Sequence, residues 1–464
     1  MSKVAQSERL EFCFCTSVFV INRGFPILFF QVDLADCLVA VSILNTLKRA
    51  RKIYYIARAK LALGITPARQ MFDLNLAQSY MLQHQIDAWI VYDFRGINPV
   101  MWQLIGKRSR TRVPVRRNFV VIPSTGEPKM LVHLIDRNIF SNVGWKVEYF
   151  VRWEEMIQKL EEMIKGCKRV AMEYSPLGSI PAISWVDGGT LDLVRSLGVE
   201  VTSSADLFQV AVSTWTEEAL KSHLYASREI AEIKDSAFDY IRSHIKDGDT
   251  VTEFAVQEFI TKELQRKNLE TEGRPIVAVN ANSANPYYVP SAQTHCIITK
   301  GDWVLIDLWA RQPGESNVFS DITWVGYVGG KVPSEHSKIF QIVQEARDLV
   351  IKKLEDASDN AELLHGWELD MVARRHIEEK GYGEYFTHRT GHSLGPGAVV
   401  HALGVNLDNL ENHDTRNIIT GIGFSIEPGI YLPKFGVRLE INVYMSKSGP
   451  KVTSPIQNDV VKLI

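Results

Sequence analysis

Four acidic residues in the C-terminal half of the sequence each lie inside an apolar segment. They are Asp307 in WVLIDLWA, Asp321 in SDITWVGY, Glu427 in FSIEPGIY and Glu440 in VRLEINVYM. An ionised carboxylate that is buried without a partner costs several kcal/mol, so each acid needs a cation or hydrogen-bond donors. Backbone amides or an arginine usually satisfy one such acid. Four of them would repel one another unless dense positive charge lay between them, so the pattern indicates a metal site.

A loop with two histidines offers an imidazole ligand for the same site. HRTGHSLGPG (388–397) places His388 and His392 in a glycine-flanked segment, where backbone and ring can approach an ion closely. Three or four carboxylates with one imidazole favour Mn²⁺, with Co²⁺, Zn²⁺ and Fe²⁺ as alternatives. Four acids suit two ions about 3.5–4 Å apart, with carboxylates bridging them. Such a pair would hold a bridging water as hydroxide near neutral pH, which is a nucleophile for a carbonyl.

The elements that must position these residues are predicted from apolar periodicity. Segment 216–245 is a long amphipathic helix with Thr216 as its N-cap, DGDT (247–250) interrupts it, and a second helix follows to about residue 266. Further helices are expected near 334–355 and 360–380. The segments around them predict strands: PIVAVN, CIIT, WVLIDLWA, DITWVGYV, GFSIEPGIYL and GVRLEINVYM. This half therefore reads as α+β with one large, mostly antiparallel sheet.

Residues 71–213 alternate between helical and strand patterns, which indicates a separate α/β domain. The expected elements are a helix at 71–85, a buried strand at 88–93, a hairpin at 118–133, a strand at 168–174 and a helix at 188–198.

Composition sets limits on the class of protein. The 464 residues are 45% hydrophobic and 23% charged, with a net charge of −2, which is typical of a globular protein of two or three domains. This balance gives no overall bias toward nucleic acid or an anionic membrane. The one basic cluster, GKRSRTRVPVRR, has six Lys or Arg from Lys107 to Arg117 and predicts a solvated loop. Five unevenly spaced cysteines show no disulfide framework, which fits a reducing cytoplasm.

Residues 1–70 have a different character from the remainder. Segment 11–44 is rich in apolar residues, but polar side chains interrupt it before any run reaches the roughly 18 residues that a spanning helix needs. It also lacks a clean signal-peptide core. Three interpretations stay open: a targeting extension, an additional helix, or a start site placed too early, with Met71 as the alternative start. We expect no stable membrane insertion.

The order of the candidate ligands resembles that of the pita-bread metallopeptidases. Asp, Asp, His, Glu and Glu, embedded as IDLWA, SDITW, HRTGHSLG, SIEPGIY and VRLEIN, are similar to aminopeptidase P, prolidase and methionine aminopeptidase, with creatinase as a metal-free relative. The motifs cover roughly residues 215–464, so the resemblance implies a pita-bread catalytic domain at 214–464. Residues 71–213 look like the smaller N-terminal domain of the creatinase and prolidase branch.

The resemblance implies a role for each ligand. Asp307 would chelate one metal ion, and Asp321 and Glu440 would bridge both ions. His392 and Glu427 would bind the second ion.

Further roles follow from the same resemblance. His388 and His401 match two histidines that bind substrate and stabilise the tetrahedral intermediate. Glu427 resembles the acid that moves a proton to the leaving amine. Arg438, two residues before Glu440, matches an arginine of the active-site network.

Two departures from the family pattern concern the hairpin and the substrate site. Asp307 and Asp321 are fourteen residues apart, somewhat farther than usual, so we expect a longer hairpin loop. Relatives often carry a histidine near NPYYVP (285–290), where Tyr287 stands here and His295 is displaced. Tyr287 can donate a hydrogen bond to substrate but cannot carry imidazolium charge.

The implied reaction is hydrolysis of a peptide bond that precedes proline, by an Xaa-Pro aminopeptidase or dipeptidase, through attack of a metal-bridging hydroxide. The implied partners are a proline-containing peptide and a second copy of the chain in a homodimer. Two alternatives remain: a creatinase-like C–N hydrolase and an inactive pita-bread binding protein. All five ligand types are present, which weakens both alternatives.

Overall fold

The computed structural model describes residues 72–106, 113–141 and 143–464. The interpretations of residues 1–70 and of a start at Met71 lie outside these residues, as does the 107–112 portion of the basic loop. None of the helices within the described ranges is both long enough and apolar enough to cross a membrane.

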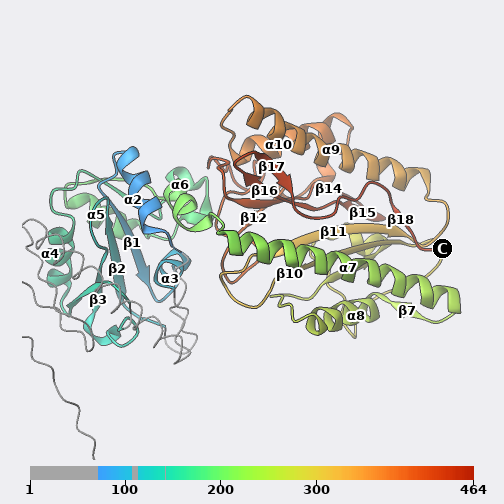
Figure 1. The fold of residues 1–464 in the computed structure, drawn as a ribbon, viewed down its shortest axis with the longest axis horizontal. Helices are drawn as coiled ribbons and strands as arrows, with labels where there is room; N and C mark the ends of the chain where they lie inside the picture. The colour runs from blue at the N-terminus through green and yellow to red at the C-terminus, as the bar shows by residue number, and fades with distance from the viewer. Residues whose placement is uncertain (1–71, 107–112, 142) are drawn as a thin grey trace, which may run out of the picture. The chain divides into compact units, whose positions relative to one another are not determined.

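A six-stranded sheet lies at the centre of residues 72–213, as their alternating pattern predicts (Figure 1). The strand order is β4–β3–β2–β1–β5–β6, and the antiparallel pair β2–β3 is the predicted hairpin. The strands are β1 (Ala88–Phe94), β2 (Arg117–Pro123), β3 (Lys129–His133), β4 (Lys146–Phe150), β5 (Arg169–Met172) and β6 (Glu200–Ser203). The helices are α2 (Leu74–Gln83), α3 (Pro99–Ile105), α4 (Trp153–Met163), α5 (Gly188–Ser196) and α6 (Ala205–Phe208).

Apolar side chains cover both faces of this sheet. Trp89 and Val91 of β1 belong to one buried cluster, whereas Ile90 and Tyr92 belong to another. A strand that is buried on both faces reads as a continuous apolar run, which is why AWIVYD shows no alternation. The domain boundary between residues 213 and 214 stays a prediction.

Four helices form the framework of the C-terminal half, close to the predicted positions. They are α7 (Glu217–Asp247), α8 (Glu253–Arg266), α9 (Ser334–Asp359) and α10 (Gly366–Glu379). The predicted N-cap is confirmed, because the Thr216 side chain accepts a hydrogen bond from the Ala219 amide. The predicted break is confirmed as well, since α7 ends at Gly248. Single helical turns are η1 (Leu134–Asp136), η2 (Pro176–Gly178), η3 (Pro181–Ile183), η5 (Asn280–Ala284), η6 (Gly383–Tyr385) and the π-helix η4 (Gln209–Ser213).

The prediction of one large sheet is wrong in one respect, because the strands divide into two four-stranded sheets. Their orders are β18–β11–β10–β8 and β12–β13–β16–β17, and β14–β15 and β7–β9 form two-stranded pairs. An apolar pattern shows that a strand is buried but not which strand it pairs with. The strands are β7 (Val251–Thr252), β8 (Ile276–Val279), β9 (Ile297–Ile298), β10 (Trp303–Ala310), β11 (Ser320–Tyr327), β12 (Ser393–Leu394), β13 (Gly423–Ile426), β14 (Gly429–Leu432), β15 (Phe435–Arg438), β16 (Ile441–Ser446), β17 (Gly449–Val452) and β18 (Val461–Lys462).

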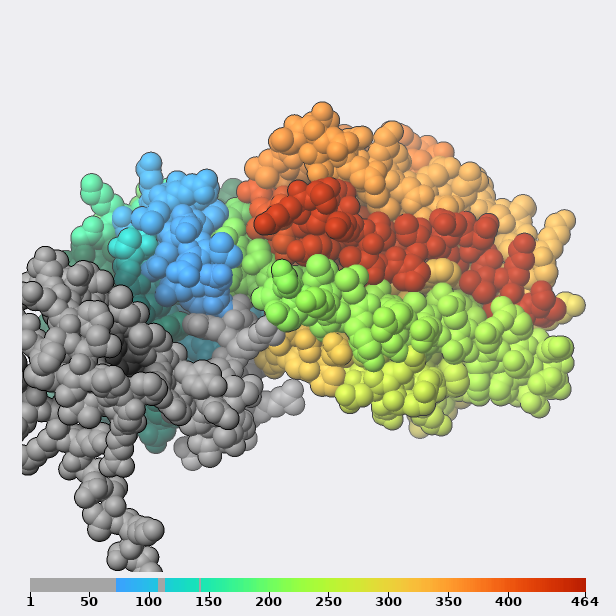
Figure 2. Space-filling model, viewed as in Figure 1, coloured from blue at the N-terminus to red at the C-terminus, as the bar shows by residue number. Residues whose placement is uncertain are grey.

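Helices cover these strands from two sides. The helices α7 and α8 pack on the outer face of β8, β10 and β11 through one apolar cluster. The helices α9 and α10 share a second cluster with the inner strand faces. Figure 1 shows the strands between these two helical layers, and in the same view Figure 2 shows α9 and α10 in orange above the C-terminal residues in red, with α7 in green below.

The hairpin β10–β11 brings the first two acids together. Its antiparallel register sets Asp307 opposite Thr323 and Trp309 opposite Asp321. Cross-strand partners share one face of a sheet, so all four side chains lie on the inner face. The connecting loop spans residues 311–319, in agreement with the expected long loop. Arg311 closes it, because its Nε lies 2.7 Å from Glu270 Oε1 and its Nη1 lies 3.2 Å from the Asn317 carbonyl.

Candidate metal centre

Three of the five predicted ligands converge closely in the structure. Ligand atoms of Asp321, His392 and Glu440 all lie within 4.8 Å of one another, and all three residues are buried. His392 Nε2 is 3.5 Å from Asp321 Oδ2 and 3.5 Å from Glu427 Oε1. Asp321 lies on β11, whereas Glu427 lies between β13 and β14 and Glu440 lies between β15 and β16, so the fold joins residues that are far apart in sequence.

Hydrogen bonds from two backbone amides hold His392 beside Glu427. The His392 amide donates to Ser425 Oγ at 3.0 Å, and the Glu427 amide donates to the Thr390 carbonyl at 2.7 Å. Gly391 permits this approach, because a Cβ there would lie 2.0 Å from the Ser425 carbonyl oxygen. The HRTGH loop therefore needs glycine at this position.

The same loop is tied to α10. The Asp370 carboxylate accepts from the Thr390 amide at 2.9 Å and from Thr390 Oγ1 at 2.7 Å. Arg374 binds Asp370 at 2.8 Å and donates to the His388 carbonyl at 2.8 Å. Helix α10 thus fixes the backbone that presents both histidines.

The fourth ligand, Asp307, is paired with Arg438. The Arg438 guanidinium donates to Asp307 Oδ2 and, through Nε, to Thr323 Oγ1 at 2.9 Å. Thr323 Oγ1 in turn donates to Glu440 Oε2 at 2.9 Å. Arg438 also lies 4.0 Å from Glu427. Arg438 and, at Glu427, Arg389 oppose the charge of these acids, and two cations leave much of the negative charge of four acids uncompensated.

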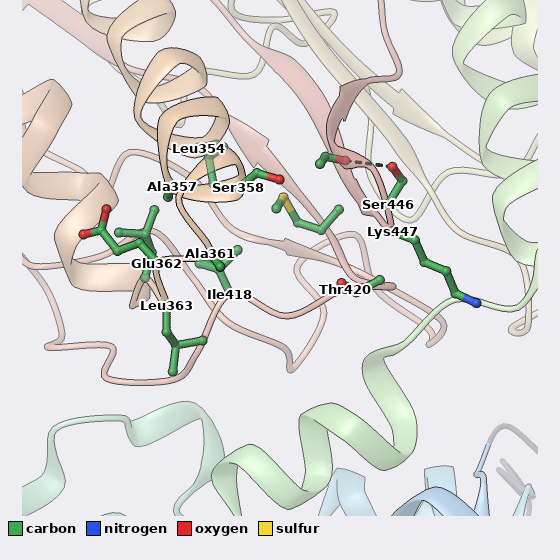
Figure 3. A pocket seen from close by; sticks show the side chains of 13 residues that line it. Leu354, Ala357, Ser358, Ala361, Glu362, Leu363, Ile418, Thr420, Ser446 and Lys447 are labelled. Carbon is green, nitrogen blue, oxygen red and sulfur yellow. Dashed lines mark hydrogen bonds between the residues drawn. The ribbon is translucent and has the colours of Figure 1, made fainter.

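All the predicted site residues line one cavity of about 670 Å³, called the acidic cavity below. Its lining residues are Glu272, Ile276, Pro286, Tyr287, Asp307, Trp309, Asp321, Thr387, His388, Arg389, His392, Val400, His401, Glu411, Glu427, Arg438 and Glu440. A smaller cavity of about 240 Å³ lies between the end of α9 and the β16–β17 turn (Figure 3). Its Glu362 is paired with Lys353 at 2.9 Å, and apolar side chains such as Leu354 and Ile418 line it, so it offers no comparable chemistry.

The acids of the cavity lack the partners that ionised carboxylates need. Asp307 Oδ1, Asp321 Oδ1 and Glu440 Oε1 are buried and have no hydrogen-bond partner among the described residues. Burial raises the pKa of Asp321, and repulsion from Asp307 and Glu427 raises it further. Burial and the charge of Asp321 likewise raise the pKa of Glu440. These three oxygens and the unbalanced charge fit divalent ions, with the carboxylate-rich ligand set that hard cations prefer.

Burial also raises the pKa values of the other two acids, Glu427 and Asp307, and the charge of a neighbouring arginine limits both shifts. Burial raises the pKa of Glu427 to about 7, although Arg438 opposes the shift. Burial also raises the pKa of Asp307 against the attraction of Arg438. A bound cation would reverse both shifts, because it stabilises the ionised carboxylates.

The histidines are neutral in this environment. Burial lowers the pKa of His388 to about 3 and that of His401 to about 4, and it places the pKa of His392 well below its usual value. His392 Nδ1 lies 3.2 Å from the Ser393 carbonyl, so Nδ1 carries the proton and the Nε2 lone pair faces the acids. This is the tautomer that a metal ligand requires.

His388 and His401 differ in how free they are to contact substrate. His388 is held at both nitrogens, with Nδ1 2.6 Å from the Arg389 carbonyl and Nε2 2.7 Å from the Tyr431 hydroxyl. The ring of His401 lies 4.1 Å from that of His392, and its Nδ1 is 3.4 Å from Arg389 Nη2. His401 therefore keeps one ring nitrogen available.

The predicted substrate residue Tyr287 lies at the edge of the cavity. It is 84% exposed, and Pro286 beside it also lines the cavity. His295 is exposed, with Nδ1 2.8 Å from the Ser291 carbonyl and its ring stacked on Phe254. His295 is not among the residues that line the cavity, and the replacement of a histidine by Tyr287 stays a prediction.

Sequence reasoning missed two residues that support the ligands. Tyr431 links His388 to Arg438, whose Nη1 donates to the Tyr431 hydroxyl at 3.2 Å. Asn442 Oδ1 accepts from the Asp321 amide at 3.0 Å, and its Nδ2 donates to the Asp321 carbonyl at 2.6 Å. Asn442 could have been noticed in the sequence, because it is a polar residue inside an apolar strand, two positions after Glu440.

Comparison with known proteins places these features in a family. Residues 226–447 match the model of metallopeptidase family M24. The uncharacterized peptidase YqhT of Bacillus subtilis is 31% identical over 268 residues, which cover 57% of this chain and 70% of that protein. An Xaa-Pro dipeptidase of Lactobacillus delbrueckii subsp. lactis is 34% identical over 50% of this chain and 58% of its own length. An Xaa-Pro dipeptidase of Pyrococcus horikoshii is 37% identical over 40% of this chain and 48% of its own. For both dipeptidases the chain spans less than two thirds of the relative.

Solved structures share the fold over a larger part of the chain. The dipeptidase PepE of Mycobacterium ulcerans has a TM-score of 0.61 at 20% identity, covering 84% of this chain and 96% of that one. The prolidase of Pyrococcus horikoshii has a TM-score of 0.55 at 23% identity, covering 84% and 99%. The X-Pro aminopeptidase of Thermotoga maritima also reaches 0.55, at 20% identity and the same coverage.

Proposed function

The chain belongs to metallopeptidase family M24, as the order of its five candidate ligands predicts, and we propose that it hydrolyses peptide bonds that precede proline. The observation that carries the proposal is the set of unpaired buried oxygens on Asp307, Asp321 and Glu440 at one cavity. Relatives that are named Xaa-Pro dipeptidase support the substrate class.

We further propose that two divalent ions, Mn²⁺ in the first instance, occupy the acidic cavity. Asp307 would hold one ion, His392 and Glu427 the other, and Asp321 and Glu440 would contact both. When bound, the ions would activate water and polarise the peptide carbonyl.

Side chains of the protein then transfer protons and stabilise the charge that develops on the substrate. Glu427 accepts a proton from the attacking water and passes it to the leaving proline nitrogen, from its position in the cavity 3.5 Å from His392 Nε2. Ser425 Oγ donates to Glu427 Oε1 at 3.1 Å and fixes the carboxylate during this transfer. His401 donates to the developing oxyanion from its free ring nitrogen, and Arg389 beside it favours negative charge there.

The Arg438–Tyr431–His388 chain serves as a positioning network. Arg438 holds Asp307, while Tyr431 fixes the ring plane of His388 at the cavity wall. We place substrate contacts on Tyr287 and on His388 as well, since both line the same cavity.

The domain division 1–70, 71–213 and 214–464, the homodimer and the cytoplasmic location are also proposals. The buried residues of two apolar clusters all precede residue 213 and those of a third all follow it, which supports the boundary between 213 and 214. Cys167 and Cys296 are free thiols, which agrees with a reducing compartment.

Metal reconstitution tests the function directly. Protein stripped with a chelator is expected to be inactive and to regain hydrolysis of Gly-Pro, or of a longer Xaa-Pro-Xaa peptide, when Mn²⁺ is added. Asp321→Ala is expected to stay inactive at the same Mn²⁺ concentration, with less metal retained per chain. Full activity of this variant would exclude the proposed metal site, and the preferred peptide length decides between aminopeptidase and dipeptidase.

A further inference from the structure

The acidic cavity contains one large aromatic side chain to which the proposed mechanism gives no role. Trp309 lies on β10, two residues after Asp307 and directly opposite Asp321 in the β10–β11 hairpin. Its half-buried indole lines the cavity. Because opposite residues of an antiparallel pair have Cβ atoms about 4.5–5.5 Å apart, the indole stands beside the proposed metal ligands.

Packing alone fixes the position of this indole. A Cβ at Gly273 would lie 2.8 Å from Cζ2 of Trp309, so the ring occupies the space that a side chain at residue 273 would need. The ring also packs against the apolar cluster that contains Val318 and Leu394. Its Nε1 has no hydrogen-bond partner among the described residues. Trp309 therefore presents a rigid apolar surface to the cavity.

The neighbours of Trp309 make this side of the cavity apolar. Ile276 and Val400 line the same cavity. Glu272, which precedes Gly273, is bound through Oε1 to the Val400 amide at 3.0 Å and brings a carboxylate to the same side. A carboxylate attracts the amino-terminal ammonium of a peptide, and in a dipeptide the residue before proline carries that ammonium. Glu272 therefore favours binding of this residue on the side of the cavity that Trp309 lines.

We propose that Trp309 is a specificity-determining residue, whose indole forms the apolar wall for the side chain that precedes proline. This inference rests on the proposed function and names its substrate class. The preferred peptides carry a large apolar residue, such as leucine, before proline.

Kinetics on two dipeptides test the proposal with Mn²⁺-loaded protein. Trp309→Ala removes the apolar contact, so kcat/KM on Leu-Pro falls roughly tenfold, mainly through KM, while Gly-Pro changes by less than about threefold. Trp309→Phe keeps an aromatic wall and breaks no hydrogen bond, so it recovers most of the activity on Leu-Pro. Metal content and melting temperature are measured for each variant.

A second variant keeps the indole and moves it. Gly273→Ala places a Cβ against the ring and is expected to lower the ratio of Leu-Pro to Gly-Pro activity, which decides the question if Trp309→Ala does not fold. An unchanged ratio, or an equal loss on both dipeptides, overturns the role of Trp309 and leaves the proposed function intact. If the wild-type protein cleaves neither dipeptide nor a longer Xaa-Pro-Xaa peptide, both proposals fall together.

Discussion

At the residue scale, the hydroxyl of Tyr431 connects two side chains of the acidic cavity, those of His388 and Arg438. Burial raises the pKa of Tyr431 to about 12, so the phenol keeps its proton at neutral pH. It can therefore donate to His388 Nε2 while it accepts from Arg438 Nη1. Because Arg438 also holds Asp307, this phenol influences a proposed ligand without touching it.

Tyr431→Phe tests that influence, because it removes the hydroxyl and keeps the ring. We expect kcat on an Xaa-Pro peptide to fall roughly ten- to hundredfold, as is usual when a partner of the ligand shell is lost. The melting temperature should change little. Tyr80→Phe, on α2, is the matched control and should keep full activity. Equal kcat values for both variants would show that the network has no role in turnover.

The ligands and their supporting residues differ in how well the sequence predicts them. Asp307 and Asp321 are visible because an acid inside an apolar strand is costly wherever that strand packs. Tyr431 gives no such signal, since a buried tyrosine is ordinary and its partners are set by the tertiary fold. Its hydrogen bond to His388 joins residues 43 positions apart.

At the scale of elements, the site depends on how β11 meets the strand that follows Glu440. Asn442 at the start of β16 is fully buried and binds both backbone groups of Asp321 on β11. It also accepts from Ser320 Oγ at 2.8 Å. The Asn442 amide therefore helps to hold the two proposed bridging acids together, beside the hydrogen bonds that join Thr323 of β11 to Glu440. Single-sequence patterns predict β11 and β16 as strands, but this contact between two sheets depends on register and remains invisible until the fold is known.

Asn442→Ala should weaken metal binding more than it weakens the fold. The substitution leaves the Asp321 amide and carbonyl without their partner, at a cost of about 1–3 kcal/mol. We expect the affinity for Mn²⁺ to fall roughly ten- to hundredfold, measured by chelator competition.

Gln457 provides the matched control for this variant. It binds the amide and carbonyl of Val325 on the same strand β11, at 2.9 and 2.7 Å. Gln457→Ala should lower the melting temperature by a similar amount and keep normal Mn²⁺ affinity. A parallel loss of metal in both variants would mean that general loosening of β11, rather than the position of Asp321, controls the site.

At the scale of the whole molecule, the clustered acids make the stability of the metal-free protein depend on pH. The folded-state pKa of Glu427 is raised to about 7, and those of Asp321 and Glu440 are raised well above their usual values. An acid whose pKa is raised on folding stabilises the fold below its unfolded pKa, and this contribution is lost as pH rises through the folded pKa. Buried histidines with lowered pKa values act in the opposite direction, but only below their unfolded value of 6.5.

Between pH 7 and 8.5, the change in stability therefore reports the ionisation of the acids and not that of the histidines. In metal-free protein we expect the melting temperature to fall by several degrees across this window, because the crowded carboxylates must ionise in the folded state. Saturating Mn²⁺ should abolish the fall, since the ion binds the ionised form and stabilises the folded chain by mass action. Differential scanning calorimetry with and without Mn²⁺ makes the comparison, and NaCl at equal ionic strength controls for screening. A metal-free melting temperature that stays level or rises would mean that Arg438 and backbone donors already compensate these charges, and the case for two ions would then lose its electrostatic basis.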